Sequence, residues 1–141
     1  MINIKKLDVT ETVFQRINHR GEYQVIAVDR LFKYCEKINH YEVRLEVTQA
    51  KAADIKRLRN IEPHRLTRLR QEDLRVPLLL IEDFGEIDMI DGHHRYIRKF
   101  LTGVLFARAY QVMPVIWKQY LVKGVPAKTA EQILATGSGI R

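Results

Sequence analysis

Apolar positions recur along the chain with two different periods, which predict both strands and helices. Residues 41–47 alternate apolar and polar side chains, and this period of two is typical of a half-buried strand. Residues 23–28 are apolar and β-branched enough for another strand, and Asp29 follows them where an N-cap would begin a helix. The first third of the chain therefore predicts a strand, a short helix and a second strand.

The middle of the chain predicts two short helices followed by a hairpin. Residues 50–60 are rich in alanine with apolar residues at helical spacing, and Pro63 is suited to the first position of the next helix. An apolar run at 76–81 is separated by turn residues at 83–86 from a second apolar segment at 87–90. Two antiparallel strands joined by a tight turn account for this pattern.

A helix with an apolar stripe is expected directly after Gly92, and Gly103 is placed to end it. Residues 105–112 then predict a returning strand. The segment 115–122 fits either a helix or a strand, whereas 126–135 favours a helix.

These elements together predict the α/β class, with an α+β mixed sheet in a single compact domain. We expect the domain to span residues 1–135 and the glycine- and serine-containing residues 136–141 to form a flexible tail.

Composition narrows the classes of function. A chain of 141 residues has room for one core, and the net charge of +7 favours polyanionic partners. Cys35 is the only cysteine, so neither an internal disulfide nor a cysteine-based zinc site is expected. No apolar run has the roughly 18 residues that a membrane span needs. The sequence therefore predicts a cytoplasmic protein without membrane contacts, and it leaves the oligomeric state open.

The five residues Asp91, Gly92, His93, His94 and Arg95 lie where a strand gives way to a helix. The first N–H groups of a helix lack partners within the helix and attract anions, above all phosphate. Gly92 permits a close backbone approach, Arg95 offers a bidentate fork, and the imidazoles of His93 and His94 supply donors. Asp91, or else Asp88, is a candidate Mg²⁺ ligand, and Asp91 is also a candidate proton acceptor.

Each of these residues alone also has a purely structural explanation. Asp91 would then be a cap, Gly92 a turn residue, and Arg95 the surface partner of Glu82 or Glu86. Taken together, however, two histidines and an arginine oppose the dipole of a helix at its N-terminus. The run as a whole therefore predicts a negatively charged ligand.

The string at residues 90–96, Ile-Asp-Gly-His-His-Arg-Tyr, resembles the signature of the ParB/sulfiredoxin-like superfamily. The proline-led apolar run at 76–81 and the short hairpin precede it, as they do in that superfamily, and the resemblance extends over about residues 61–112. It implies a compact α/β fold that binds a nucleotide with its phosphates at this turn and helix. It also implies that Arg65 and Arg68, near a helix start, act as cationic clamps on the phosphates.

The chain departs from two branches of the superfamily. His93 stands where sulfiredoxins have a catalytic cysteine, and the acid implicated in CTP hydrolysis by ParB partition proteins is missing. The unaltered Asp-Gly-His-His-Arg string is most similar to that of ADP-dependent free-serine kinases. This likeness implies phosphoryl transfer with ATP or another nucleotide (ADP or CTP) and Mg²⁺, with Asp91 and His93 as catalytic residues.

Two further hypotheses stand beside a nucleotide-dependent ATPase or kinase-like phosphotransferase. Residues 51–75 hold more basic than acidic side chains, which favours a DNA-binding or regulatory module without catalysis. A module that binds another protein is the third hypothesis.

Overall fold

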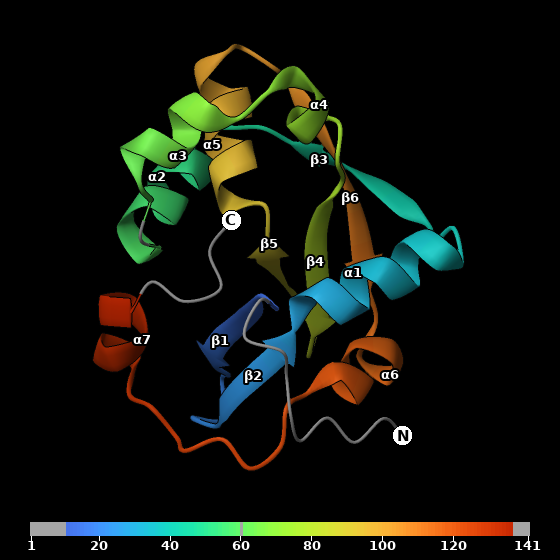
Figure 1. The fold of residues 1–141 in the computed structure, drawn as a ribbon, viewed down its shortest axis with the longest axis vertical. Helices are drawn as coiled ribbons and strands as arrows, with labels where there is room; N and C mark the ends of the chain where they lie inside the picture. Colours follow the sequence, from blue (N-terminus) through green and yellow to red (C-terminus); the bar gives the residue numbers. More distant parts are fainter. Residues whose placement is uncertain (1–10, 60, 137–141) are drawn as a thin grey trace.

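The chain folds into short strands and helices around a mixed β-sheet (Figure 1). The computed structural model describes residues 11–59 and 61–136. The elements in chain order are β1 (Val13–Ile17), β2 (Tyr23–Ala27), α1 (Val28–Lys37), β3 (Glu42–Glu46), α2 (Gln49–Leu58), α3 (Pro63–Arg68), α4 (Gln71–Leu74), β4 (Leu78–Asp83), β5 (Glu86–Asp91), α5 (His93–Leu101), β6 (Phe106–Val112), α6 (Pro114–Trp117), the 3-10 turn η1 (Lys118–Tyr120) and α7 (Ala130–Thr136).

The central sheet has the strand order β3-β6-β4-β5, and β1 pairs with β2 in a separate hairpin. β4 runs parallel to β6, whereas the β3–β6 and β4–β5 pairs are antiparallel. Because Leu79 near the start of β4 pairs with Asp91 at the end of β5, the chain enters β4 and leaves β5 at one end of the sheet. The residues singled out by the motif therefore lie at that end.

The predicted hairpin is confirmed as β4 and β5. Phe84 and Gly85 form its turn with positive φ angles of 51° and 81°. Two consecutive residues with positive φ are typical of a type I′ turn, whose twist matches that of antiparallel strands. The tight turn fixes the register as far as the Leu80–Met89 pair, and a register shift between Leu79 and Leu80 then pairs Asp91 with Leu79 near the start of β4.

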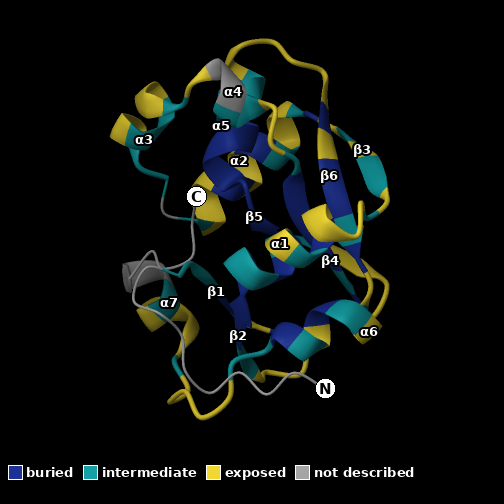
Figure 2. Cartoon of the chain, turned by 45° about the vertical axis from the view of Figure 1, so that its right-hand side comes forward, coloured by how far each residue is buried: buried dark blue, intermediate teal, exposed yellow. Residues whose placement is uncertain are grey.

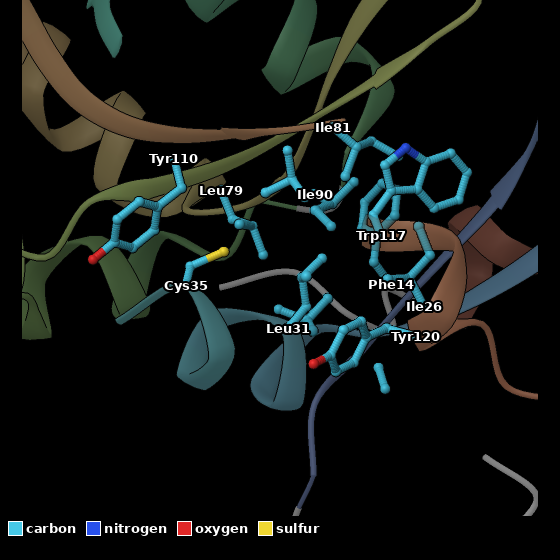
Figure 3. Close-up of a cluster of buried hydrophobic side chains, with 13 residues drawn as sticks. Phe14, Ile26, Leu31, Cys35, Leu79, Ile81, Ile90, Tyr110, Trp117 and Tyr120 are labelled. Atoms are coloured by element: carbon cyan, nitrogen blue, oxygen red, sulfur yellow. The ribbon is translucent and has the colours of Figure 1, made fainter. Parts of the chain in front are cut away.

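Strand β4 is buried on both faces, at Leu78–Ile81 (Figure 2). Along β4, Leu79 and Ile81 pack into one core, and Leu78 and Leu80 pack into the other. Figure 3 shows the first core, where Leu31 and other α1 side chains meet the sheet. Helices α2 and α5 cover the opposite face. This two-sided burial explains why residues 78–81 are apolar without alternation.

Helix α5 is fixed to the sheet by a buried tyrosine. The Tyr96 hydroxyl donates to the Glu46 carbonyl and accepts from the Thr48 N–H, both at 2.9 Å. The Thr48 side chain also caps α2 by accepting from the Lys51 N–H at 3.1 Å. One turn of α5 is thereby tied to the link between β3 and α2.

The N-terminal part differs from expectation in two respects. Strand β1 had no prediction, and the N-cap of α1 is Ala27 rather than Asp29. Strand β2 runs directly into α1, so Asp29 lies in the first helical turn, where its Oδ2 accepts from the Thr12 N–H at 2.7 Å. Asp29 thus joins α1 to the residue before β1.

The C-terminal part is partly helical. Residues 115–122, which fitted either type, form most of α6 and η1, followed by a single bridge between Leu121 and Ile26. The helix expected over 126–135 begins only at Ala130, so the prediction was wrong for residues 126–129. In the expected tail, residues 137–141 lie outside the described residues.

The predicted fold class is confirmed: the protein has mixed α and β content with a mixed sheet in one compact domain. Among the described residues, every helix is too short or too polar to span a membrane.

Candidate functional site

Gly92 makes the turn from β5 into α5. Its φ of 102° lies in the left-handed region, which favours glycine. A Cβ added here would also lie 2.4 Å from Cδ2 of Leu78, which is fully buried. Both the backbone angle and the close approach therefore require glycine, and they place residues 93–95 in the first turn of α5.

Arg95 is buried and holds the two strand ends together. Its Nη1 donates to the carbonyls of Val76 and Pro77 at 2.9 and 3.0 Å, and its Nη2 donates to Oδ2 of Asp91 at 3.2 Å. Asp91 is only 2% exposed. The alternative of a surface pair with Glu82 or Glu86 is thus wrong, because the guanidinium turns inward to the entry of β4.

His94 contacts the segment before α3. Its Nε2 accepts a hydrogen bond from the Glu62 N–H at 3.1 Å. A ring nitrogen that accepts from an amide carries no proton, so this imidazole is neutral with its proton on Nδ1. His94 therefore fixes α5 to the segment before α3 and contributes no positive charge.

His93 points away from His94, because adjacent residues of a helix are about 100° apart. Its Nε2 accepts from Nε of Arg59 at 3.3 Å, and its ring stacks on Phe14 with centroids 5.8 Å apart. Complete burial, aided by the Arg59 charge, lowers the pKa of His93 from 6.5 to about 3. This imidazole is also neutral near pH 7.

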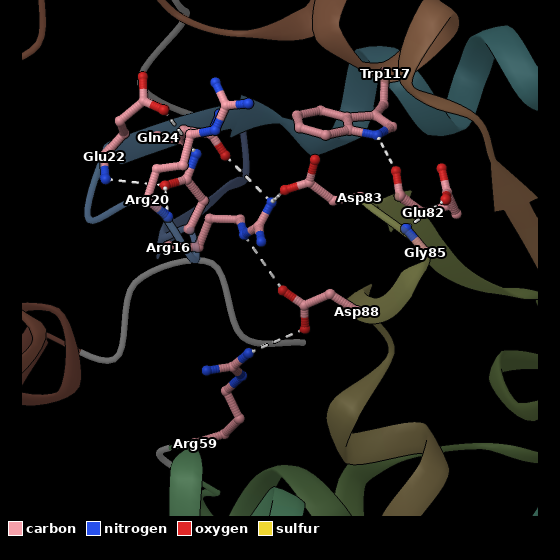
Figure 4. Close-up of polar contacts among 11 residues, drawn as sticks. Arg16, Arg20, Glu22, Gln24, Arg59, Glu82, Asp83, Gly85, Asp88 and Trp117 are labelled. Atoms are coloured by element: carbon pink, nitrogen blue, oxygen red, sulfur yellow. Dashed lines mark hydrogen bonds and ion pairs between the residues drawn. The ribbon is translucent and has the colours of Figure 1, made fainter.

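A group of charges surrounds His93 on that side. Figure 4 shows Asp88 between Arg16 and Arg59, with nitrogen–oxygen distances of 3.5 Å to each. Burial raises the pKa of Asp88, and the two guanidinium groups oppose this rise. Asp88 is therefore part of an ion-paired cluster, and it lines a different cavity from Asp91.

The other side of the first turn opens into a cavity of about 460 Å³, which is within the range of small-molecule sites. Asp91, His94 and Arg95 line it from the end of β5 and the start of α5, and Arg65 lines it from α3. Four of the residues predicted for the site thus come together. Gly92, His93 and Arg68 are not part of the lining that the described residues form.

Helix α1 forms a wall of the cavity that sequence reasoning missed. Asp29, Phe32, Lys33 and Glu36 line it, at positions i, i+3, i+4 and i+7 of one helix face. This periodic face is visible in the sequence, but nothing in the sequence places it opposite residues 91–95. Leu69, Asp73 and Val76 complete the lining.

The described lining has mixed charge. Four carboxylates, those of Asp29, Glu36, Asp73 and Asp91, face three cations, those of Lys33, Arg65 and Arg95. The pKa of Asp73 is lowered, first by its hydrogen bond from the Arg70 N–H and also by charges that include Arg95. The cavity is therefore polar and rich in charge without being an all-cationic anion site.

The residues of the cavity fit Mg²⁺ only as an ion that a bound nucleotide brings with it. No group of three or more described histidine, cysteine or carboxylate side chains is arranged to hold a metal. Mg²⁺ commonly takes one or two protein carboxylates and completes its shell with phosphate oxygens and water. Asp91 fits that role for Mg²⁺ brought in by a nucleotide, although its Oδ2 already pairs with Arg95.

Comparison of the chain with protein families, with curated proteins and with solved structures yields no match. The likeness to the ParB/sulfiredoxin-like superfamily therefore remains a prediction from the motif.

Proposed function

We propose that the protein binds a nucleotide in the cavity beside α5, with the phosphates against the first turn of α5. One observation carries this proposal. Asp91, His94 and Arg95 line the same cavity of about 460 Å³ as Arg65, which precedes them by 26 or more residues in sequence. A volume of this size accommodates a nucleotide-sized ligand.

The local electrostatics support a phosphate at this place. The N-cap of α5 is a glycine, so no side chain of that residue caps the first N–H groups. These groups and the helix dipole favour an anion. The carboxylates of the lining oppose a bare polyphosphate, and they favour its Mg²⁺ complex, in which the cation offsets the repulsion.

The roles of the individual residues follow from their contacts. Arg95 binds two carbonyls and Asp91, so it shapes the site. We assign Arg65 to the phosphates because it lines the cavity from α3. In the proposal Asp91 is either the Mg²⁺ ligand or the proton acceptor. His93 has no part in it, because it is sealed on the far side of α5.

The reaction that we propose is phosphoryl transfer, either to water as an ATPase or to an acceptor as a phosphotransferase. Such reactions depend on positioning and on neutralising charge on the transferred group. Arg65, the α5 N-terminus and Mg²⁺ at Asp91 would supply these.

The test is a titration of the whole protein with ATP, ADP, CTP and GTP in the presence of Mg²⁺, followed by calorimetry and thermal shift. We expect one of these nucleotides to bind and Arg65→Ala to weaken it about tenfold, as for the loss of one charge-assisted hydrogen bond. Arg68→Ala is the matched control, since Arg68 is exposed on the same helix and outside the lining. Absence of binding by the unaltered protein at millimolar nucleotide would overturn the proposal.

The exposed basic side chains of α2 to α4 favour DNA binding as a second candidate function. Lys56, Arg57, Arg68, Arg70 and Arg75 are all exposed on this part of the surface. Affinity for duplex DNA should then fall steeply between 50 and 200 mM salt, roughly 10³-fold or more for six phosphate contacts. A protein that gives no DNA shift at low salt would exclude this candidate.

A further inference from the structure

The cavity has two chemically different walls. One wall consists of the first turn of α5 and Arg65 of α3, whereas the wall at α1 offers an aromatic ring together with Lys33 and Glu36. Polyphosphate recognition has no use for an aromatic ring. A nucleoside does, because every base has a face that stacks on such a ring.

Phe32 is held in place by its neighbours. It is half-buried, and its ring meets Tyr110 edge to face with centroids 5.5 Å apart. Leu31 and Cys35 on the adjacent face of α1 are buried in the core and anchor the helix (Figure 3). The ring is therefore a fixed feature of the cavity wall.

Lys33 and Glu36 are exposed, so they lie at the rim of the same wall. A carboxylate accepts hydrogen bonds from ribose hydroxyls and from exocyclic amino groups of bases. These groups belong to the nucleoside end of a nucleotide, and a phosphate chain has none of them.

We infer that α1 is the specificity wall of the cavity: Phe32 contacts the base and Glu36 accepts from the ribose or the base, while the phosphates lie toward α5. This inference rests on the proposed function, and it goes further by dividing the ligand between two walls. The segment that selects the nucleoside is then α1, which lies outside the part of the chain that carries the motif.

The experiment compares tripolyphosphate with ATP, CTP and GTP, each with Mg²⁺, on the full chain. Phe32→Leu keeps apolar volume but removes the aromatic face, so we expect about a tenfold loss of nucleotide affinity and unchanged tripolyphosphate affinity. Arg65→Ala should weaken both ligand types. Glu36→Gln should lower nucleotide affinity by a smaller factor, and it should not lower tripolyphosphate affinity, because it removes a negative charge that repels a polyanion.

Tyr34→Leu is the matched control for Phe32→Leu. Tyr34 is a half-buried aromatic residue of α1 that packs against the same core and lies outside the described cavity lining. It should leave the affinities for all four ligands unchanged, and circular dichroism should show all variants folded.

The outcomes separate the two proposals. If tripolyphosphate and nucleotides both fail to bind the unaltered protein, the proposed function is overturned and this inference with it. If nucleotides bind but neither Phe32→Leu nor Glu36→Gln changes the affinity for nucleotides or for tripolyphosphate, the specificity wall is overturned and the nucleotide site stands. The same conclusion follows if Phe32→Leu weakens the binding of tripolyphosphate as much as the binding of nucleotides.

Discussion

The two sides of the first turn of α5 differ although adjacent residues of the same type occupy them. His94 lines a cavity of about 460 Å³, whereas His93 borders one of about 70 Å³ and is covered by Arg59 and Phe14. Both rings are about 1% exposed, and both use Nε2 as an acceptor. The His94 side therefore faces a cavity, whereas the His93 side is packed against other side chains.

The difference shows that a contiguous motif is divided between two tasks. Since neighbouring helical residues diverge by about 100°, a His-His pair serves two different surroundings. The expected positive charge of the histidines is absent, because each accepts a hydrogen bond. The positive groups that remain for a ligand are the helix terminus and the cations of the lining.

The largest effect is expected from removing Arg95, which lines the cavity although its guanidinium hydrogen-bonds to the ends of β4 and β5. Arg95→Ala leaves buried Asp91 without its ion-pair partner and two carbonyls without their donor. We expect the free energy of unfolding, measured by urea denaturation, to fall by about 3–5 kcal/mol.

The control is the double variant with Asp91→Asn and Arg95→Met, which removes both charges and should recover part of that loss. If Arg95→Ala alone keeps the stability of the unaltered protein and lowers only nucleotide affinity, then Arg95 is a ligand-binding residue and its structural role is refuted.

Gly92→Ala tests the turn that separates the two sides. The added Cβ would meet Leu78 at 2.4 Å and would adopt a φ of 102°, so we expect a loss of about 3 kcal/mol in unfolding free energy. Gly103→Ala is matched to it, because Gly103 also has positive φ but has no atom within 4 Å of the added Cβ. It should cost only about 1–2 kcal/mol. Equal losses in the two variants would show that the contact with Leu78 is unimportant.

The sealed side predicts a specific dependence of stability on pH. The pKa of His93 is about 3 in the folded protein and near 6.5 when unfolded, so the unfolded state binds the extra proton first as pH falls. The contribution of His93 is complete above pH 6.5 and is lost as pH falls toward 3, with a slope of up to about 1.4 kcal/mol per pH unit.

His93→Gln keeps an acceptor near Arg59 but does not titrate. Unfolding free energies of both proteins between pH 4 and 7 should therefore converge as pH falls, and subtracting them removes the opposite contribution of Asp88, whose pKa is raised. Parallel pH profiles would mean that His93 is not buried in its neutral form.

Local patterns predicted the elements well because their determinants lie close in sequence. The turn at Phe84 and Gly85 follows from its neighbours, and Pro63 opens α3 as its position suggested. Asp29 was misassigned as an N-cap because its hydrogen bond comes from Thr12, 17 residues away. Long-range partners of this kind leave no periodic signal.

The candidate site, likewise, was predictable only where its residues lie close together in sequence. The motif indicates where Asp91 and Arg95 lie, since strand, glycine turn and helix are consecutive. The wall contributed by Phe32 was not predictable, because it depends on how α1 crosses the sheet some 60 residues earlier in the chain. Nor does the sequence show that Arg59 approaches His93 from α2's C-terminal end.

The smallest effect expected is the one that compares two arginines near the end of α2. Arg59 is 24% exposed, lies over Phe14 and bonds His93, whereas Arg57 is 70% exposed and pairs only with Asp54 among the contacts that the structure gives it.

We expect Arg59→Ala to lower the unfolding free energy by about 1–2 kcal/mol, because it leaves Asp88 and the His93 acceptor without this donor. Arg57→Ala should change it by less than about 0.5 kcal/mol, as is usual for an exposed ion pair. Since the Arg59 charge helps to lower the pKa of His93, its removal should also narrow the pH range over which stability declines, so that the decline ends at a higher pH. Equal effects of the two substitutions in urea denaturation would show that the His93 side is as open to solvent as the surface of α2.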